Sequence, residues 1–249
     1  MPGQGGKKGE GSVVPAKQFG ESLVNWKVPV PPGQAVLEGH TVRLERLSAD
    51  AHAADLFAAV SGHDDLWDYL PYGPFSSASA YHRWMKESAS GQDPFFYALR
   101  DKGTGQCGGL ASFLRITPEA GSIEIGHICL SPQIQRSAAA TEMQFLMMDW
   151  AFCAGYRRFE WKCDALNVPS RRAAQRLGFS FEGVFRQATI VKGRNRDTAW
   201  FSVIDSEWPA LREAYRVWLS PANFDEAGRQ KERLSDLTRL TRAGSDPTL

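Results

Sequence analysis

A predicted strand, a polar loop and a long helix follow one another in one stretch of the chain, and their order suits anion binding. β-Branched residues fill the strand at residues 122–130, and Pro132 ends it because proline lacks an amide donor. Apolar residues at three- and four-residue spacing predict a helix over residues 137–154, which Gly155 terminates. The first-turn amides and the dipole of such a helix point at the loop before it, so this loop is a candidate anion site.

Few other side chains have types and spacings that suggest proton transfer or metal binding. His127 alternates with Ile125 in the predicted strand, and it is either a second proton acceptor or a partly buried, hydrogen-bonded histidine. The four cysteines are Cys107, Cys129, Cys153 and Cys163. They show no close-pair spacing, which predicts buried free thiols rather than disulfides or zinc ligands, and we expect no metal site.

Alternating and helical patterns predict the elements that position these groups. Strands are expected at residues 41–47, 95–100, 107–116, 122–130, 159–163, 179–189 and 197–204, and helices at 49–60, 77–88, 137–154, 167–177, 206–219 and 225–240. An aromatic-rich loop covers residues 64–75. Glu160 and Lys162 share one face of their strand, and this face is predicted to be solvated.

The length of 249 residues and the 43% hydrophobic content predict one main domain with additions at both ends. Residues 1–21, rich in glycine and lysine, are expected to form a disordered tail. Residues 22–36 are predicted to be an extended arm, because a proline pair imposes extended backbone. The domain itself spans residues 37–219, and residues 220–249 form a C-terminal helical extension.

The charge and hydropathy of the chain exclude some classes of partner. The 29 lysines and arginines against 28 acidic residues leave a net charge of +1. The chain as a whole therefore has no strong positive potential that would attract nucleic acid or an acidic membrane surface. No apolar run approaches the roughly 18 residues that span a bilayer, and the N-terminus lacks the apolar block of a signal peptide. We therefore expect a soluble, cytoplasmic protein.

The order of the predicted elements and five short motifs resemble the GNAT superfamily of acetyl-CoA-dependent N-acetyltransferases. The motifs are Glu124-Ile125-Gly126, Ala140-Thr141-Glu142, Gly155 to Arg158, Asn167-Val168-Pro169-Ser170 and Arg176-Leu177-Gly178-Phe179. They are most similar to the branch that includes the ribosomal-protein alanine N-acetyltransferases. The resemblance covers residues 37–208 and implies an α+β fold, with a central mixed, mostly antiparallel sheet flanked by helices.

One position departs from the family pattern. The pyrophosphate loop of the family carries a central glycine, where this chain has Ala138. A positive φ there would cost alanine on the order of 1–2 kcal/mol, whereas a helical φ would favour it. Arg136 would then supply a charged phosphate contact that glycine does not.

The resemblance also implies roles for individual residues. Glu124 would be the base that accepts the amine proton, or else a carboxylate at the strand edge that faces solvent or pairs with an arginine. Ser170 would give a proton to the departing thiolate, or else only cap its helix. Cofactor contacts are implied for Ile128, Cys129, Leu130, Gln135, Arg136, Ser137, Ala138, Ala139, Ala140, Thr141, Asn167, Ser170 and Arg176, with a backbone amide near Ile128 or Cys129 meeting the thioester carbonyl where two strands separate. Trp67, Tyr69 and Tyr72 would line the acceptor site, or else form a small satellite core.

The implied reaction is acetyl transfer from acetyl-CoA to a primary amine by direct attack, without a metal. The acceptor is either a protein N-terminus or a small molecule, and an α-amine with a pKa near ~7.7 needs less help from a base than a lysine near ~10.4. The alternative is a non-catalytic acyl-CoA-binding protein that keeps the fold. The terminal additions suggest a homodimer, or a monomer with frayed ends.

Overall fold

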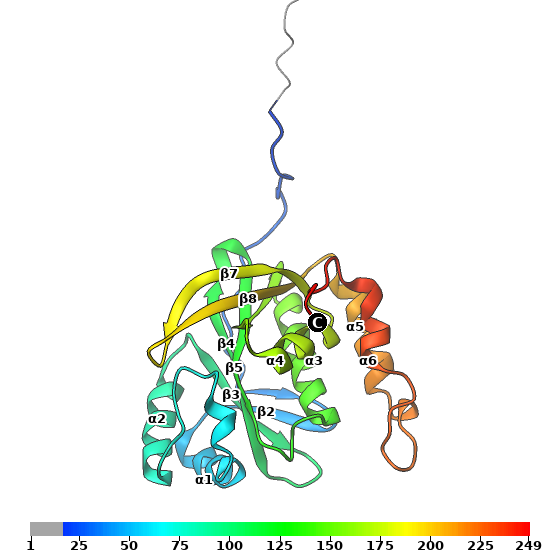
Figure 1. Ribbon diagram of the computed structural model, residues 1–249. Coiled ribbons are helices and arrows are strands. Elements are labelled where there is room, and N and C mark those ends of the chain that lie inside the picture. Colours follow the sequence, from blue (N-terminus) through cyan, green and yellow to red (C-terminus); the bar gives the residue numbers. More distant parts are fainter. Residues whose placement is uncertain (1–16) are drawn as a thin grey trace, which may run out of the picture.

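The computed structural model describes residues 17–249 (Figure 1), so most of the predicted tail lies outside the described residues. The strands are β1 Val36–Glu38, β2 Val42–Arg46, β3 Phe95–Asp101, β4 Cys107–Thr117, β5 Ser122–Leu130, β6 Arg158–Asp164, β7 Ser180–Val191 and β8 Arg194–Ile204. The helices are α1 Ala49–Val60, α2 Ala78–Ser90, α3 Ala138–Cys153, α4 Val168–Arg176, α5 Trp208–Leu219 and α6 Leu234–Thr238, with 3-10 turns at Asp64–Trp67 (η1), Pro118–Ala120, Pro221–Asn223 and Arg239–Thr241.

The strands form one eight-stranded sheet in the order β1-β2-β3-β4-β5-β6-β8-β7. Every neighbouring pair is antiparallel except β5 and β6, which run parallel. This confirms the predicted α+β class with a mixed, mostly antiparallel sheet. Within residues 17–249, no helix combines the length and the apolar character that crossing a bilayer requires.

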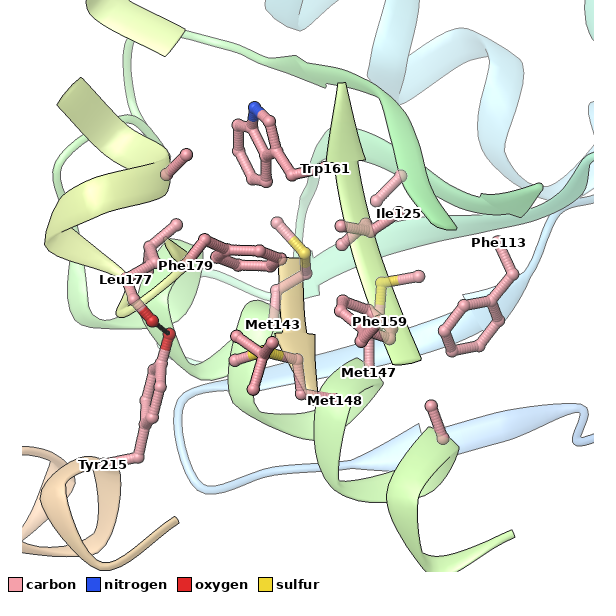
Figure 2. Packing of buried hydrophobic residues seen from close by; sticks show 14 of the residues in the cluster. Phe113, Ile125, Met143, Met147, Met148, Phe159, Trp161, Leu177, Phe179 and Tyr215 are labelled. Carbon is pink, nitrogen blue, oxygen red and sulfur yellow. Dashed lines mark hydrogen bonds between the residues drawn. The ribbon is translucent and has the colours of Figure 1, made fainter. Parts of the chain in front are cut away.

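Helices cover both faces of the sheet (Figure 1). Helices α3 to α5 pack on one face, where Met143, Met147 and Phe159 contribute to the larger core (Figure 2). Helices α1 and α2 pack on the other face over the N-terminal strands, around a second core that contains Leu56 and Tyr81. The sheet therefore separates two layers, and any site that passes between strands connects them.

Glu142, the last residue of the Ala140-Thr141-Glu142 motif, has a structural role. Its buried carboxylate accepts hydrogen bonds from the amides of His40 and Thr41 at 2.7 and 2.6 Å, and from the Thr41 hydroxyl at 2.6 Å. A Cβ atom on Gly39 would lie 2.6 Å from the Glu142 Cδ atom, so glycine is required for this approach. Glu142 thus fastens the β1–β2 turn to helix α3.

The helix predicted over residues 225–240 is wrong for most of its length. The Gly228 amide closes a tight turn onto the Asp225 carbonyl at 2.8 Å, and Gly228 has a left-handed φ of 72°. The Asp225 side chain accepts the amides of Ala227 and Arg229, which competes with helix formation. Helix α6 begins only at Leu234.

Two smaller expectations also change. All four cysteines are free thiols as predicted, but Cys153 is exposed whereas the other three are buried. The strand face of Glu160 and Lys162 is not solvated: the Lys162 side chain is only 7% exposed and that of Glu160 only 11%. The predicted solvated face is wrong because neighbouring strands bring further charged side chains against it.

Candidate active site

Strands β5 and β6 separate partway along their length. Residues Ser122–Ile125 pair with Arg158–Trp161, but β5 continues to Leu130 and β6 to Asp164 without pairing to each other. A register shift between β4 and β5 and a left-handed φ of 51° at His127 accompany the separation. On the side toward β6, Ile128 and Cys129 of β5 therefore face no paired strand, as the family resemblance implied.

The loop before α3 presents free amides beside this opening. Ser137 caps the helix, and its hydroxyl accepts the Ala140 amide at 3.1 Å. Among the described residues, the amides of Ala138 and Ala139 donate to no acceptor. Ala138 is the first helical residue, and the left-handed φ of 59° falls on Arg136 instead. Alanine therefore suits position 138, where helical backbone needs no glycine.

The other residues of the loop divide into exposed and buried groups. Arg136 is exposed and has no acidic partner within 4 Å among residues 17–249. Gln135 is exposed too, and its side-chain amide donates to the Leu130 carbonyl at 2.9 Å. Thr141 is 3% exposed and lies inside the first turn of α3. Arg136 therefore offers a charge without an acidic partner to an anion at this helix terminus.

Asn167 and Ser170 lie at the start of α4, on the same side of the opening. The Asn167 side chain caps the helix by accepting the Ser170 amide at 3.1 Å. The Trp161 indole N–H donates to the Ser170 hydroxyl oxygen at 3.1 Å. Because that oxygen already accepts a hydrogen bond, the Ser170 hydroxyl proton is oriented away from Trp161 and can be donated elsewhere.

Arg176 and Arg171 contact elements next to α4. The Arg176 guanidinium contacts the Thr141 hydroxyl at 3.3 Å and lies 5.2 Å from the centroid of the Trp218 ring. Arg171 forms a buried ion pair with Asp246 near the C-terminus, with Nε to Oδ2 at 2.7 Å. Both arginines therefore tie α4 to its neighbours.

On the opposite face of the opening, Glu124 belongs to a buried ionic network. The Arg115 guanidinium lies 2.7 Å from both Glu124 oxygens, and the Lys162 ammonium lies 2.9 Å from one of them. Lys162 also pairs with Glu160 at 2.7 Å and lies 3.8 Å from the centroid of the Trp200 ring. Burial raises the pKa of Glu124, although Lys162 and Arg115 oppose the rise. The sequence left three roles open for Glu124, and the structure shows that its carboxylate pairs with an arginine, Arg115.

His127 lies at the same opening and is held neutral. Its Nδ1 atom is 2.9 Å from the Tyr72 hydroxyl, and the two rings stack at 5.5 Å. Burial, with help from the charges of Arg115 and Arg196, lowers the pKa of His127 to about 4. A neutral imidazole with one nitrogen engaged keeps the other for a proton or a substrate.

The three predicted acceptor residues have different surroundings. Trp67 is 2% exposed and packs edge-on against Phe75 and Tyr81, so it belongs to the second core. Tyr69 is 42% exposed, and its hydroxyl donates to the Leu166 carbonyl at 3.3 Å. Tyr69 and Tyr72 thus contact residues at the opening, whereas Trp67 is buried in the second core.

The long β7–β8 hairpin completes this side of the molecule. It arches toward the α1–α2 layer (yellow in Figure 1), and the Lys192 ammonium at its tip donates to the Trp67 carbonyl at 2.7 Å. The hairpin and the tyrosine-bearing loop therefore enclose the face that carries Glu124 and His127. The sequence signalled neither Lys162 nor this enclosure, because both depend on which strands become neighbours.

One further cluster has potential metal-binding side chains: Glu45, His52 and Cys107. Both ring nitrogens of His52 are already engaged. Nδ1 lies 3.0 Å from the Ser48 amide and must accept its proton, so Nε2 carries the hydrogen that reaches Glu45 at 2.9 Å. No lone pair of His52 is free for a metal, and the cluster serves to link β2 to α1.

These features agree with the comparison of the chain with known proteins. The family model described as Acetyltransferase (GNAT) domain matches residues 41–180, more than half of the chain. The chain belongs to the GNAT acetyltransferase family. A GCN5-related N-acetyltransferase from Brucella melitensis is 48% identical, with 87% of this chain and all of that chain covered at a TM-score of 0.85.

Two other relatives support the same assignment. A probable acetyltransferase of the GNAT family from Chromobacterium violaceum is 40% identical, covering 80% of this chain and 100% of that chain at a TM-score of 0.74. The uncharacterized N-acetyltransferase p20 of Bacillus licheniformis is 26% identical over 174 residues, which cover 68% of this chain and 97% of that protein. Ribosomal-protein acetyltransferases share the fold at 18% and 22% identity, which shows the fold alone.

Proposed function

We propose that this GNAT protein transfers an acetyl group from acetyl-CoA to a primary amine by direct attack. The observation that carries the proposal is the opening between β5 and β6. It joins the free amides at the start of α3 and the Ser170 hydroxyl on one face of the sheet to Glu124 and His127 on the other. Acetyl-CoA in this opening would meet groups that bind its pyrophosphate, and its thioester would meet a proton donor and a proton acceptor.

The chain offers suitable partners for each part of the cofactor. The free amides of Ala138 and Ala139, together with the unpaired Arg136 guanidinium, fit a pyrophosphate at a helix N-terminus. The unpaired edge of β5 from Ile128 to Leu130 fits an extended amide-containing chain. When bound, acetyl-CoA supplies an acetyl group activated as a thioester.

Ser170 is the proposed donor of the proton that the departing thiolate needs. Its oxygen accepts the Trp161 indole hydrogen, which leaves its own proton as the available donor. Asn167 holds this hydroxyl in place by capping the same helical turn. Capping and proton donation are therefore compatible roles on neighbouring residues.

Two side chains on the acceptor face can take the amine proton. Glu124 is the proposed base of the family resemblance, and burial favours its protonation, but proton uptake requires Arg115 or Lys162 to release one oxygen. His127 is neutral and has one nitrogen outside its contact with Tyr72. We propose that Glu124 acts as the base through a water molecule. The test is to measure kcat of Glu124→Gln and of His127→Gln at the same pH, and the larger loss of kcat identifies the base.

The experiment that tests the function combines binding and turnover. Titration of acetyl-CoA by calorimetry gives the affinity, and release of the free thiol is then measured against a panel of small amines and peptides with free N-termini. We expect binding and acceptor-dependent thiol release. Tight binding without turnover for any acceptor would instead favour the alternative, a non-catalytic acyl-CoA-binding protein.

A further inference from the structure

One positive side chain near the acceptor face, Arg196, lies outside its ionic network. This network pairs three acids with three bases, namely Glu124, Glu160 and Glu182 with Arg115, Lys162 and Arg158. Arg196 lies on β8, next to this network. Among residues 17–249, no carboxylate comes within ion-pair distance of Arg196. The Arg196 guanidinium therefore has no acidic partner within the described part of the chain.

The register of β8 places Arg196 on the acceptor face. Trp200 lies opposite Lys162, whose ammonium covers the Trp200 ring, and Thr198 lies opposite Asp164. Side chains alternate along a strand, so Arg196 shares the face of Trp200. Its charge also acts on His127 of β5 and on Cys163 of β6, the two strands that separate. Arg196 therefore lies near the opening.

Two donors on this strand face are buried and unsatisfied. The Arg196 Nε atom and the Trp200 Nε1 atom have no hydrogen-bond acceptor among the described residues. Buried donors in folded proteins nearly always have partners, and an orphaned one calls for a ligand or a water. Phe185 stacks on Trp200 at 4.4 Å, so the surroundings of these donors are aromatic.

We propose that Arg196 binds a carboxylate of the acceptor, so that the preferred substrate is an amine that also carries a carboxylate. This rests on the proposed function. A guanidinium binds a planar carboxylate through two parallel hydrogen bonds, so Arg196 matches one carboxylate group of an acceptor. A polyamine or another multiply cationic acceptor would meet repulsion from Arg196. The carboxylate belongs either to a free amino acid or to an acidic residue at a peptide N-terminus.

Matched pairs of acceptors isolate the effect of the carboxylate. One pair is phenylalanine and phenylalanine amide. The other is a dipeptide amide that begins with aspartate and its analogue that begins with asparagine. For the wild-type protein with acetyl-CoA, we expect kcat/KM to be about 10- to 100-fold higher for the carboxylate member of at least one pair, as charge-assisted hydrogen bonds allow. The preferred pair identifies the source of the carboxylate.

The variant Arg196→Met removes the guanidinium and keeps the apolar stem. It should bring kcat/KM for the carboxylate member down to that of its amide partner. Arg194→Met is the matched control, because Arg194 is exposed on the same hairpin, and it should keep the wild-type ratio. Circular dichroism and the melting temperature check that both variants fold.

The possible outcomes separate this proposal from the proposed function. No thiol release with any amine would reject the acetyltransferase function itself. Turnover without a carboxylate preference in the wild-type protein would overturn only the role of Arg196. An equal loss of both rates in Arg196→Met would also overturn it, because the guanidinium would then act on the reaction rather than on the acceptor.

Discussion

Ser170 is the proposed proton donor to the departing thiolate, because its hydroxyl oxygen accepts the Trp161 indole hydrogen and its own proton stays available. Ser170→Ala should lower kcat about 10²- to 10⁴-fold, the usual contribution of a general acid. The affinity for acetyl-CoA should change little, because the helix cap comes from Asn167 and remains. Thiol release measures the first effect and calorimetry the second. Unchanged turnover would remove Ser170 from the mechanism.

His127 makes stability depend on pH. An unfolded imidazole titrates near 6.5, whereas burial lowers the pKa of folded His127 to about 4. Between these values the unfolded state binds more protons, so the free energy of unfolding falls as pH drops, by up to about 3 kcal/mol. Urea denaturation at several pH values should show a flatter dependence for His127→Gln than for the wild-type protein. His82→Gln, on helix α2, is the control; equal slopes in all three proteins would contradict the prediction.

At the scale of elements, the start of α3 explains why the chain tolerates the loss of the family glycine. Ala138 is helical and contributes its amide, not its side chain, to the proposed phosphate site. Ala138→Gly should therefore destabilise the protein by up to about 1 kcal/mol, the cost of glycine in a helix, without tightening acetyl-CoA binding. Denaturation and calorimetry measure the two effects. A marked gain in affinity would show that a flexible loop is needed there.

Helix α4 depends on the C-terminal segment for its position. Asp246 is buried and pairs with Arg171, and the Gly244 carbonyl accepts the Phe181 amide at 3.1 Å. Asp246→Ala leaves the Arg171 charge buried without a partner, which should cost about 3 kcal/mol of the free energy of unfolding.

The double variant Arg171→Met/Asp246→Ala tests that explanation. It should be less destabilised than the sum of the two single variants, because neither charge then remains buried alone. Additive losses in urea denaturation would mean that the pair is not coupled. Because Asn167 and Ser170 occupy the same helix, Asp246→Ala should also lower turnover.

At the scale of the whole molecule, local patterns predicted elements better than they predicted the site. The bounds of α1 and β5 follow from residue spacing and agree with the prediction, because each element shows one apolar face or run to the core. The contact of His127 with Tyr72 spans 55 residues and that of Arg171 with Asp246 spans 75. No local pattern encodes such pairs, so the network around Glu124 and the role of the C-terminus emerged only from the fold.

The N-terminal arm docks on its own chain, which bears on the predicted homodimer. The Trp26 indole donates to the Gly155 carbonyl at 3.4 Å, and the hydroxyls of Tyr156 and Tyr97 donate to the Val30 and Gln34 carbonyls at 3.4 and 3.0 Å. These contacts tie the arm to the end of α3 and to β3. The arm therefore has partners within the chain and needs no second subunit.

Deleting residues 1–34 should lower stability without changing the oligomeric state. Loss of three hydrogen bonds, including that of the Trp26 indole, should cost about 1–2 kcal/mol, or a few degrees in melting temperature for a domain of this size. Sedimentation equilibrium of the full-length and truncated proteins gives the masses, and thermal denaturation gives the stability. A dimer that dissociates on truncation would show instead that the arm joins two subunits, and the intrachain contacts would then be secondary to an interface.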